Sequence, residues 1–408
     1  MKNFSSYITE QKNTHMTHIE DKVLYGGVNG TRDAIMALRS MRDMLGGEHD
    51  GNVSVKWDGA PAVFAGTDPS DGRFFVAKKG IFNKSPKVYK SDGDIDADTS
   101  GDLNAKLKLA LQYLPELGIK GVIQGDFLYA SSDLKKSKIK GKDYITFHPN
   151  TIVYAVPAGT DMAKQVQAAK IGIVWHTSYS GSSFEGLKAS YGVDISKFRK
   201  STNVWSQDAM LRDMTQYTMS KKDTNEVNAM LSEAGRIFNR ISGTTLRQLE
   251  ANQALAQTIE TFNNTYVRKG EVVGNTTVHV NKLVSWIKAR YRKEIQSRKT
   301  EKGKSVQQKK LDEVLSFFSA ENKSSLKEIF ELQKMIVLAK LKLINILNKL
   351  GNVDTFLKTN RGYRTTGQEG YVAIDKLGGD AVKIVDRMEF SYANFSPDVL
   401  KGWDSPSR

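Results

Sequence analysis

The feature that most constrains this chain's fold is a change in the period of its apolar residues. Residues 1–183 and 351–408 contain short runs that alternate between apolar and polar, whereas residues 184–350 place apolar residues at helical spacing, as at Val227 and Leu231. A period of two is typical of β-strands, and a period of about 3.6 is typical of helices. The sequence therefore predicts an α+β fold, with a mainly helical domain of residues 184–350 inserted into a strand-rich domain of residues 1–183 and 351–408.

Composition narrows the functional classes. The 408 residues are enough for two or three domains. They include no cysteine and only six histidines, so disulfides, cysteine-based zinc sites and a thiol nucleophile are excluded, and a histidine-only metal site is not expected. Lys and Arg number 60 against 45 Asp and Glu, a formal net charge of +15. A protein this basic tends to associate with polyanions such as nucleic acids.

The sequence carries no signal for a membrane. No apolar run approaches the roughly 20 residues of a membrane-spanning helix. The first residues, 1–5, are polar and lack the apolar core of a signal peptide. We therefore expect a cytoplasmic protein with no membrane partner and, by default, a monomer.

Cap and turn signals predict several boundaries. The glycine-rich stretch Gly26–Gly30 reads as a loop, after which Thr31 caps a helix that ends at Gly46. The loop follows no strand and lacks the Gly-Lys-Ser/Thr ending, so a phosphate-binding P-loop is not expected. The acidic, polar residues 91–101 are expected to form a loop, as are the lysine-rich residues 135–142.

One lysine stands between two apolar segments. Lys56 ends the alternating run from Val53, Asp58 and Gly59 follow, and a second apolar run reaches Phe64. Asp-Gly between two strand patterns predicts a tight hairpin turn. A lysine held half-buried beside a cleft loses its proton more readily than a free lysine and can act as a nucleophile.

Three further charged residues lie in or beside apolar strand patterns. Asp126 lies within the run 121–129, Glu369 precedes Gly370 and the next apolar run, and Lys383 lies within residues 381–385. A turn at residues 378–380 would join the last two runs. A charge among apolar neighbours is costly without a partner, so each is expected to have one.

The positive charge is concentrated in one part of the chain. Between Lys282 and Lys349 there are 17 Lys and Arg against 7 Asp and Glu, which leaves +10. Basic residues alternate with Trp286 and Tyr291 in a surface suited to a nucleic-acid backbone. The candidate nucleic-acid-binding residues are Lys288, Arg290, Arg292 and Lys293. The alternative is a solvated helix face.

The stretch around Lys56 resembles motif I, Lys-x-Asp-Gly, of the covalent nucleotidyltransferases, which comprise ATP-dependent polynucleotide ligases and mRNA capping enzymes. The resemblance implies that Lys56 attacks the α-phosphate of a nucleotide and holds the nucleoside monophosphate as a phosphoramidate. It also implies that Val55, Asp58 and Gly59 contribute to nucleotide binding. A basic residue before a glycine on a nearby strand contacts the nucleotide in these families, and Lys78 occupies that place where arginine is usual.

The other charged residues follow the order of the family's remaining motifs. Asp126 resembles the acid of motif III, which binds the ribose or a metal-bound water, although glutamate is usual there. Glu369 resembles the magnesium-binding glutamate of motif IV, and Lys383 resembles the phosphate-binding lysine of motif V. The family usually has a second lysine two residues later. This chain has Val385 there, and Arg387 is the candidate to compensate.

The resemblance implies a nucleotidyltransferase domain built on antiparallel sheets, of the ATP-grasp-like type found in ligase adenylation domains. A large helical insertion would interrupt this domain. It implies ATP and Mg²⁺ (or Mn²⁺) as cofactors, with Glu369 and Asp126 as metal ligands. An aromatic that stacks on the purine is also implied, with Trp175 and Tyr154 as alternatives.

The activity expected from the resemblance is ATP-dependent polynucleotide ligation through lysyl-AMP. About 22 residues follow Asp386, too few for the OB-fold that DNA ligases and capping enzymes carry, so phage-type RNA ligases are the nearest group. RNA is therefore favoured over DNA as the substrate, and the host cytoplasm is the expected setting of a bacteriophage protein. The alternatives are a DNA ligase, another nucleotidyltransferase, or an inactive nucleic-acid-binding protein on a ligase-like fold.

Overall fold

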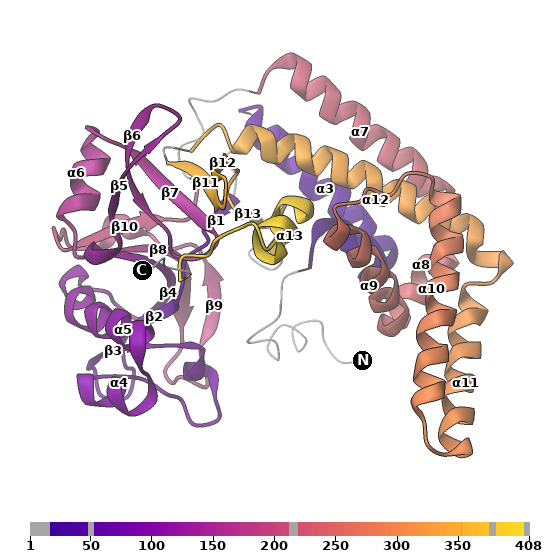
Figure 1. Cartoon of the computed structure of the whole chain (residues 1–408), viewed down its shortest axis with the longest axis horizontal. Coiled ribbons are helices and arrows are strands. Elements are labelled where there is room, and N and C mark those ends of the chain that lie inside the picture. The colour runs from indigo at the N-terminus through magenta and orange to yellow at the C-terminus, as the bar shows by residue number, and fades with distance from the viewer. Residues whose placement is uncertain (1–16, 48–52, 212–218, 352, 375–380, 404–408) are drawn as a thin grey trace.

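The computed structural model describes residues 17–47, 53–211, 219–351, 353–374 and 381–403. Figure 1 shows an arch in which strands form one limb and helices the other, with the long helix α12 running across the top. Strands and helices are both abundant, which confirms the α+β class predicted from the sequence. Across the described ranges, no helix combines the length and apolar character that crossing a bilayer requires.

The largest sheet, called here the large sheet, has the order β10-β8-β4-β2-β3, with β9 paired to β8. Its pairings are antiparallel except that of β10 with β8. One of its faces packs on helices α4 and α5 through a cluster that contains Phe127 and Trp175. The bounds of these elements are β2 Ala62–Thr67, β3 Phe74–Ala77, β4 Val122–Ala130, β8 Ile171–Ser180, β9 Lys188–Tyr191, β10 Val204–Asp208, α4 Asp92–Asp98 and α5 Gly101–Tyr113.

A second sheet, the outer sheet, lies beside it in the same limb and has the order β12-β11-β7-β6-β5, all antiparallel. Helix α6 packs on β6 and β7. The bounds are β5 Lys135–Ile139, β6 Lys142–Phe147, β7 Ile152–Pro157, α6 Asp161–Ala168, β11 Asp354–Thr359 and β12 Gly362–Thr365.

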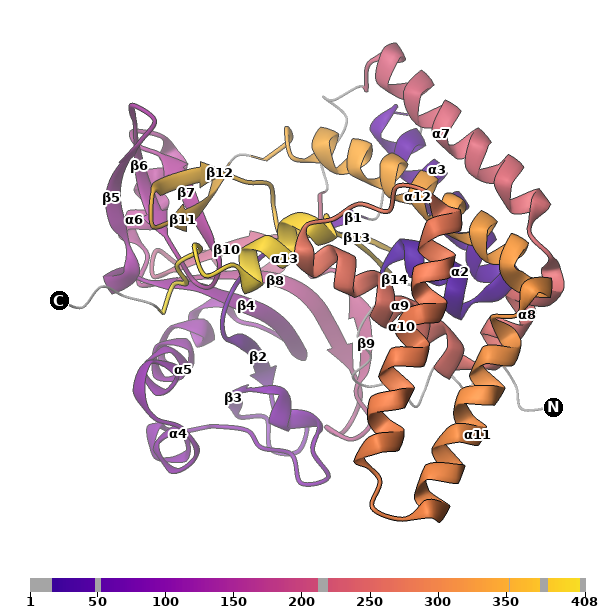
Figure 2. The ribbon, with the colours of Figure 1, turned by 45° about the vertical axis from the view of Figure 1, so that its right-hand side comes forward.

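The third sheet, the site sheet, consists of β1 (Val53–Lys56), β13 (Gly370–Ile374) and β14 (Ala381–Ile384) in the antiparallel order β1-β13-β14. It joins strands that are more than 300 residues apart in the chain. Figure 2 shows it between the two limbs of the arch. The turn expected at residues 378–380 lies outside the described residues.

Helices from both ends of the chain build the other limb around one apolar cluster, called here the helical core. The cluster also takes residues of the site sheet. Helix α13 (Arg387–Phe395) follows β14 and packs on α9. The remaining bounds are α2 Lys22–Tyr25, α3 Gly27–Leu45, α7 Lys221–Arg240, α8 Gly243–Ala251, α9 Gln253–Lys269, α10 Thr276–Ser297, α11 Glu301–Phe317 and α12 Ala320–Leu347.

The predicted domain boundaries are wrong at two points. Strands β9 and β10 lie after residue 184 yet pair with β8, so the strand-rich limb continues to residue 208 and the helices begin at α7. Helix α3 was assigned to the strand-rich domain, but its apolar face packs on α7, α8 and α12. Local periodicity does not report which neighbour an amphipathic helix packs against.

The predicted hairpin at Asp58-Gly59 is also wrong. Strand β1 pairs with β13, whereas β2 pairs with β3 and β4, so the two strands belong to different sheets. Residues 57–61 instead cross from one sheet to the other. The backbone N of Ala60 donates to Phe127 O (2.9 Å), and Phe127 N donates to Pro61 O (2.9 Å), which fixes the crossing against β4.

Three local predictions fail for identifiable reasons. Residues 91–101 are not all loop, because Ser91 and Asp94 form a capping box that begins α4. Thr31 is not a cap; helix α3 already begins at Gly27, whose carbonyl accepts the Thr31 hydroxyl hydrogen bond (2.7 Å). Residues 135–139 form strand β5 despite their lysines, because β6 pairs with them.

A buried ion pair ties the N-terminal segment to the helical limb. Lys340 of α12 is 1 % exposed, and its Nζ lies 2.8 Å from Glu20 Oε1. Burial would raise the pKa of Glu20, but the positive charges of Lys340 and Arg387 hold it well below its usual range. Removing one partner of such a pair leaves an uncompensated buried charge.

Replacing Lys340 with alanine should therefore lower the free energy of unfolding by about 3 kcal/mol or more. Lys342→Ala is the matched control, because Lys342 lies on the same helix and pairs with Asp223 and Glu226 at the surface. That change should stay within about 1 kcal/mol. Urea denaturation measures both values, and equal effects for the two variants would contradict this role of Lys340.

Candidate active site

The site sheet separates apolar from charged residues by simple alternation. Lys56 pairs with Gly370, and Lys383 pairs with Val372, which also pairs with Ser54. Directly paired residues share a face, so Lys56 and Lys383 are on the same face. The opposite face carries apolar residues that enter the helical core, namely Val53, Tyr371, Val382 and Ile384. Burial of that face leaves the lysines on the other face, where Lys383 Nζ lies 5.9 Å from the ring centroid of Phe390 in α13.

Lys56 and Glu369 form the central contact of the site. Lys56 Nζ donates a hydrogen bond to Glu369 Oε2, and the two charges form an ion pair. The Lys56 side chain is 29 % exposed and that of Glu369 10 % exposed, so the amine is open to solvent while the acid is nearly covered. The register explains the meeting, because Glu369 directly precedes the Gly370 that pairs with Lys56.

The environment shifts the protonation of both neighbours of Lys56. Burial raises the pKa of Glu369 to about 7, with a further rise from the Asp58 charge, against the opposing effect of Lys56 and Lys383. Burial lowers the pKa of Lys383, and the Lys56 charge lowers it further. The two amines and the acid therefore interact within one partly desolvated volume.

The segment that follows Lys56 passes directly against Asp126 of β4. A Cβ added at Gly59 would lie 2.6 Å from Asp126 Cβ and 3.0 Å from the Phe127 carbonyl oxygen. Only glycine allows the segment after Lys56 to pass so close to β4. Burial raises the pKa of Tyr154, and the charges of Asp58, Glu369 and Asp126 raise it further, so all three acids lie within electrostatic reach of its hydroxyl.

Two buried polar atoms, in residues that flank the central pair in the sequence, have no hydrogen-bond partner among the described residues. They are Trp57 Nε1 and Gln368 Oε1, which adjoin Lys56 and Glu369 in the sequence. Buried polar groups are nearly always hydrogen-bonded, so an unpaired donor and acceptor need an explanation.

Asp58 and Val55 were predicted to bind nucleotide. In the structure both make contacts within the protein instead. Asp58 is 4 % exposed, and its carboxylate accepts hydrogen bonds from Asn150 Nδ2, Thr151 N, Thr151 Oγ1 and Ile152 N at 2.6–2.9 Å. It anchors the crossing segment to the outer sheet. Val55 packs on the helical core, and its N donates to Ala209 O (2.7 Å).

The two predicted stacking aromatics are core residues. Trp175 is fully buried against α5, and its Nε1 donates to Ser206 Oγ (3.3 Å). Tyr154 is fully buried, stacks on Trp57 with ring centroids 4.8 Å apart, and accepts a hydrogen bond from Asp58 N through its hydroxyl. Neither ring has a free face for a base, so both assignments are corrected.

His176 is the residue that the sequence analysis missed. Asp126 pairs with Val174, so His176, two residues further, shares the face of Asp126, whereas Trp175 pairs with Gly125 and faces the other way. His176 Nε2 lies 3.7 Å from Asp126 Oδ2, and 27 % of the side chain is exposed. Strand alternation alone could have selected it.

Lys78 and Arg387 are not brought to Lys56. Lys78 Nζ pairs with Asp98 of α4 (3.1 Å), on the side of the large sheet away from Asp126. Arg387 is mostly buried and pairs with Asp21 at 2.7 Å, so it does not replace the second lysine of motif V. The four basic residues predicted to bind nucleic acid lie on α10, in the other limb.

The described residues fit a magnesium ion only in company with a ligand. Among them, no three His, Asp or Glu side chains gather as a metal site. Mg²⁺ is commonly held by one or two carboxylates together with substrate phosphates and water. Asp58 is not available for such a role, because its carboxylate oxygens already accept hydrogen bonds from Asn150, Thr151 and Ile152.

Comparison with known proteins gives a family but no activity. A family model described as a family of unknown function, DUF6267, matches residues 13–398, and the chain belongs to this family. No curated protein and no solved structure matches. Any assignment of chemistry therefore depends on the site itself.

The anchoring role of Asp58 predicts a stability effect. Asp58→Asn would turn an amide NH₂ group toward hydrogen-bond donors, and we expect a loss of about 2 to 4 kcal/mol in the free energy of unfolding. Asp71→Asn is the control, because Asp71 is exposed at a turn. Chemical denaturation measures both. A fully stable Asp58→Asn protein would show that the carboxylate does not hold the crossing segment.

Glu369 predicts a pH dependence of stability. Its folded pKa of about 7 lies above the model-peptide value of 4.5, so the folded state holds the proton more tightly and loses stability as pH rises from about 4.5 to 7. Glu369→Gln removes this loss, and from pH 5 to pH 8 the variant should gain about 2 to 3 kcal/mol relative to the unchanged protein. Denaturation at both pH values measures the difference. A constant difference between the two proteins would contradict the raised pKa.

Proposed function

We propose that this protein is an ATP-dependent nucleotidyltransferase that seals polynucleotides through a covalent lysyl-AMP intermediate on Lys56. The observation that carries the proposal is that Lys56 of β1 pairs with Glu369, which directly precedes β13, while Lys383 of β14 lies on the same face of this sheet within electrostatic reach of both. The order of these residues in the chain and the resemblance to nucleotidyltransferase motifs I, IV and V support it.

The first step uses groups that the site brings together. The Lys56 amine attacks the α-phosphorus of ATP; a nitrogen–phosphorus bond forms, and the bond from that phosphorus to the bridging oxygen of pyrophosphate breaks. Glu369 accepts a hydrogen bond from the amine and orients it, and the proton that the amine loses passes to solvent, to which the Lys56 side chain is 29 % exposed. Lys383 stabilises the negative charge that develops on the phosphate oxygens.

The groups around the central pair take supporting roles. Asp126, with His176 beside it, holds the ribose. Glu369 and Asp126 would hold Mg²⁺, which neutralises triphosphate charge when bound. AMP then passes to a 5′-phosphate end, and a 3′-hydroxyl displaces it to form the phosphodiester.

Nucleic acid is the proposed partner, with RNA favoured over DNA, and the cytoplasm is the proposed setting. The basic residues on α10, namely Lys288, Arg290, Arg292 and Lys293, are the proposed contacts. A nucleic-acid-binding protein without catalytic activity is the second candidate. Val385 stands where the second motif V lysine is usual, and Arg387 is engaged with Asp21, which favours that alternative.

Incubation with ATP labelled at the α-phosphate and Mg²⁺, followed by denaturing electrophoresis, tests the proposal. The unchanged protein should carry a covalent label, and Lys56→Ala should carry none. Lys383→Ala should reduce the rate of labelling by at least about 100-fold, because an oxyanion-stabilising group is lost. Lys138→Ala, an exposed lysine of the outer sheet, should label normally.

Labelling of the Lys56→Ala protein would overturn the assignment of the nucleophile. Absence of label with ATP, GTP and NAD alike would favour the inactive binding protein. If label forms, a panel of nicked and single-stranded RNA and DNA substrates then separates RNA ligase, DNA ligase and other transferases.

A further inference from the structure

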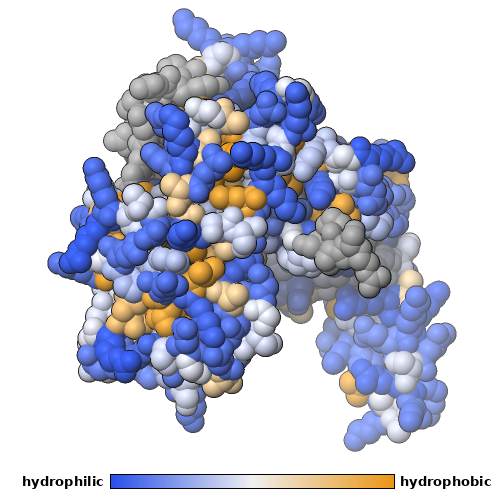
Figure 3. All heavy atoms as spheres, turned by 60° about the vertical axis from the view of Figure 1, so that its left-hand side comes forward, coloured by the Kyte–Doolittle hydropathy of each residue, from blue (hydrophilic) through white to orange (hydrophobic). Residues whose placement is uncertain are grey.

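We propose that the projecting hairpin of α10 and α11 binds the phosphate backbone of double-stranded nucleic acid. The hairpin arm, defined here as residues 288–310, comprises the end of α10, the connection, and the first half of α11. It extends away from the rest of the helical limb in Figures 1 and 2. The projecting lobe at the lower right of Figure 3 is almost entirely hydrophilic.

The arm carries an unusual surplus of cations. Residues 288–310 contain ten Lys and Arg and only two acids, Glu294 and Glu301. The two acids pair with Arg290 and Lys304. The other eight basic side chains make no ion pair with any described residue; they are Lys288, Arg292, Lys293, Arg298, Lys299, Lys302, Lys309 and Lys310, all exposed.

Acids nearly balance basic residues elsewhere in the helical limb, because residues 219–350 outside the arm contain 14 Lys and Arg against 11 Asp and Glu. Arg240 pairs with Glu328, Lys334 with Glu331, and Lys342 with Asp223 and Glu226. Ion pairs of this kind, within or between helices, neutralise surface charge locally. The arm therefore departs from the pattern of its own domain. Like charges packed on one hairpin repel each other, and a polyanion relieves that repulsion.

The aromatic residues of the arm's base are committed to packing. Trp286 and Tyr291 are half-buried against the helical core. The Trp286 ring packs on Phe262, with centroids 5.6 Å apart, and Arg290 covers it with its guanidinium carbon 5.5 Å from the ring centroid. Unpaired strands are bound largely by stacking their bases on free aromatic faces. Both rings also line the hollow at the arm's base, but Phe262 and Arg290 pack on Trp286 and only part of Tyr291 is exposed.

The remaining contacts available are to phosphates. A hollow at the arm's base is lined by the cations Arg290 and Lys310, the acid Glu294 and the aromatic residues Trp286 and Tyr291, together with Thr258, Ile287 and Gln307. Double-stranded nucleic acid presents its phosphates outward and its bases inward, so cations on a rigid helical scaffold are sufficient to bind it. This geometry favours a duplex over an unpaired strand.

The inference deepens the proposed function by naming a substrate class, but it does not depend on lysyl-AMP chemistry. The arm is on the helical limb, and Lys56 is on the site sheet. Binding is measured without nucleotide, so failure of the labelling experiment leaves the binding result unaffected. Conversely, an arm variant that no longer binds duplex should still take label from ATP.

The test compares the unchanged protein with a variant in which Lys288, Arg292, Lys299 and Lys309 are all alanine. Fluorescence anisotropy measures affinity for a short RNA duplex, the matching DNA duplex and one unpaired strand over a range of salt concentrations. The unchanged protein should bind a duplex more tightly than the strand. The variant should lose at least about tenfold in affinity, and its slope of log K against log salt should be shallower by about 3 to 4.

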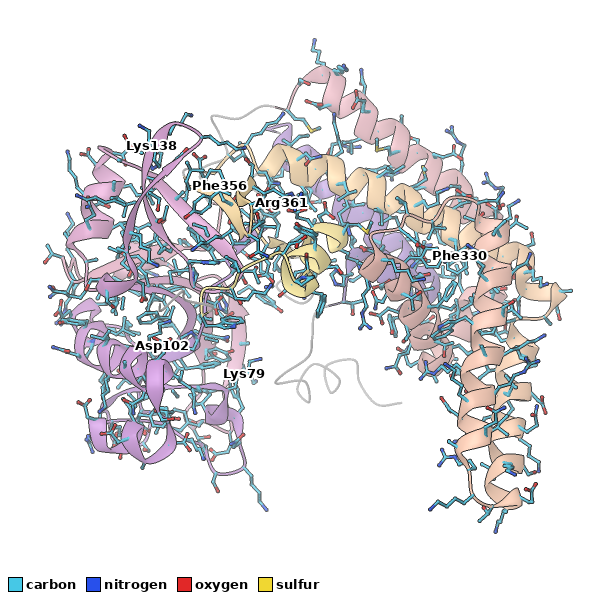
Figure 4. All side chains as sticks on the ribbon, in the orientation of Figure 1. Lys79, Asp102, Lys138, Phe330, Phe356 and Arg361 are labelled. Atoms are coloured by element: carbon cyan, nitrogen blue, oxygen red, sulfur yellow. The ribbon has the colours of Figure 1, made fainter. Side chains whose placement is uncertain are left out.

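The matched control removes the same charge from the opposite end of the molecule. Lys135, Lys136, Lys138 and Lys142 are exposed on β5 and β6, and Figure 4 shows Lys138 on that hairpin, far from the arm. Their replacement by alanine should change duplex affinity less than about twofold. Equal losses in both variants, no loss in the arm variant, or tighter binding of the unpaired strand would each overturn the proposal. The two duplexes together show whether RNA or DNA is preferred.

Discussion

The pairing of β1 with β13 and β14 is the constraint on which the rest of the structure depends. It brings Val53–Lys56 to a segment more than 300 residues later in the chain. Alternation then divides the sheet, so that one face enters the helical core and the other carries Lys56 and Lys383. Burial of the apolar face fixes the register, because a shift of one residue would turn the lysines into the core. The same register places Glu369 beside Lys56.

Both limbs of the arch hold this sheet in place. On the helical side, Arg387 follows β14 directly and pairs with Asp21, while Lys340 pairs with Glu20. The backbone of Lys383 also donates to Thr17 O (3.3 Å), so the N-terminal segment borders β14. On the strand side, the crossing segment after Lys56 is anchored by Asp58 and by contacts of Gly59 with β4. The candidate site therefore lies between the two limbs. The contacts that hold its sheet in place also position the residues proposed for its chemistry.

Much of the fold could be predicted from the sequence, because strands β4, β6, β7 and β8 and the long helices carry strong local periodicity. The partners of the strands could not be predicted in this way. Asp-Gly at 58–59 is a sequence typical of a hairpin turn. Here the Asp58 carboxylate instead accepts four hydrogen bonds from residues 150–152, where strand β7 of the outer sheet begins. In the site, the charged residues within strands were identified because a charge in an apolar run needs a partner. Trp175 was predicted as a stacking residue from its aromatic type, with Tyr154 as the alternative, and the pairing of β8 with β4 that puts His176 on the face of Asp126 was not known.

The central claim is that Lys56, Glu369 and Lys383 form one nucleotide-binding site. A crystal structure of the protein grown with ATP and Mg²⁺ tests it most directly. We expect electron density for an adenylate joined to Lys56 Nζ, with Lys383 in contact with its phosphate oxygens. A nucleotide bound elsewhere, with the Lys56–Glu369 pair undisturbed, would contradict it.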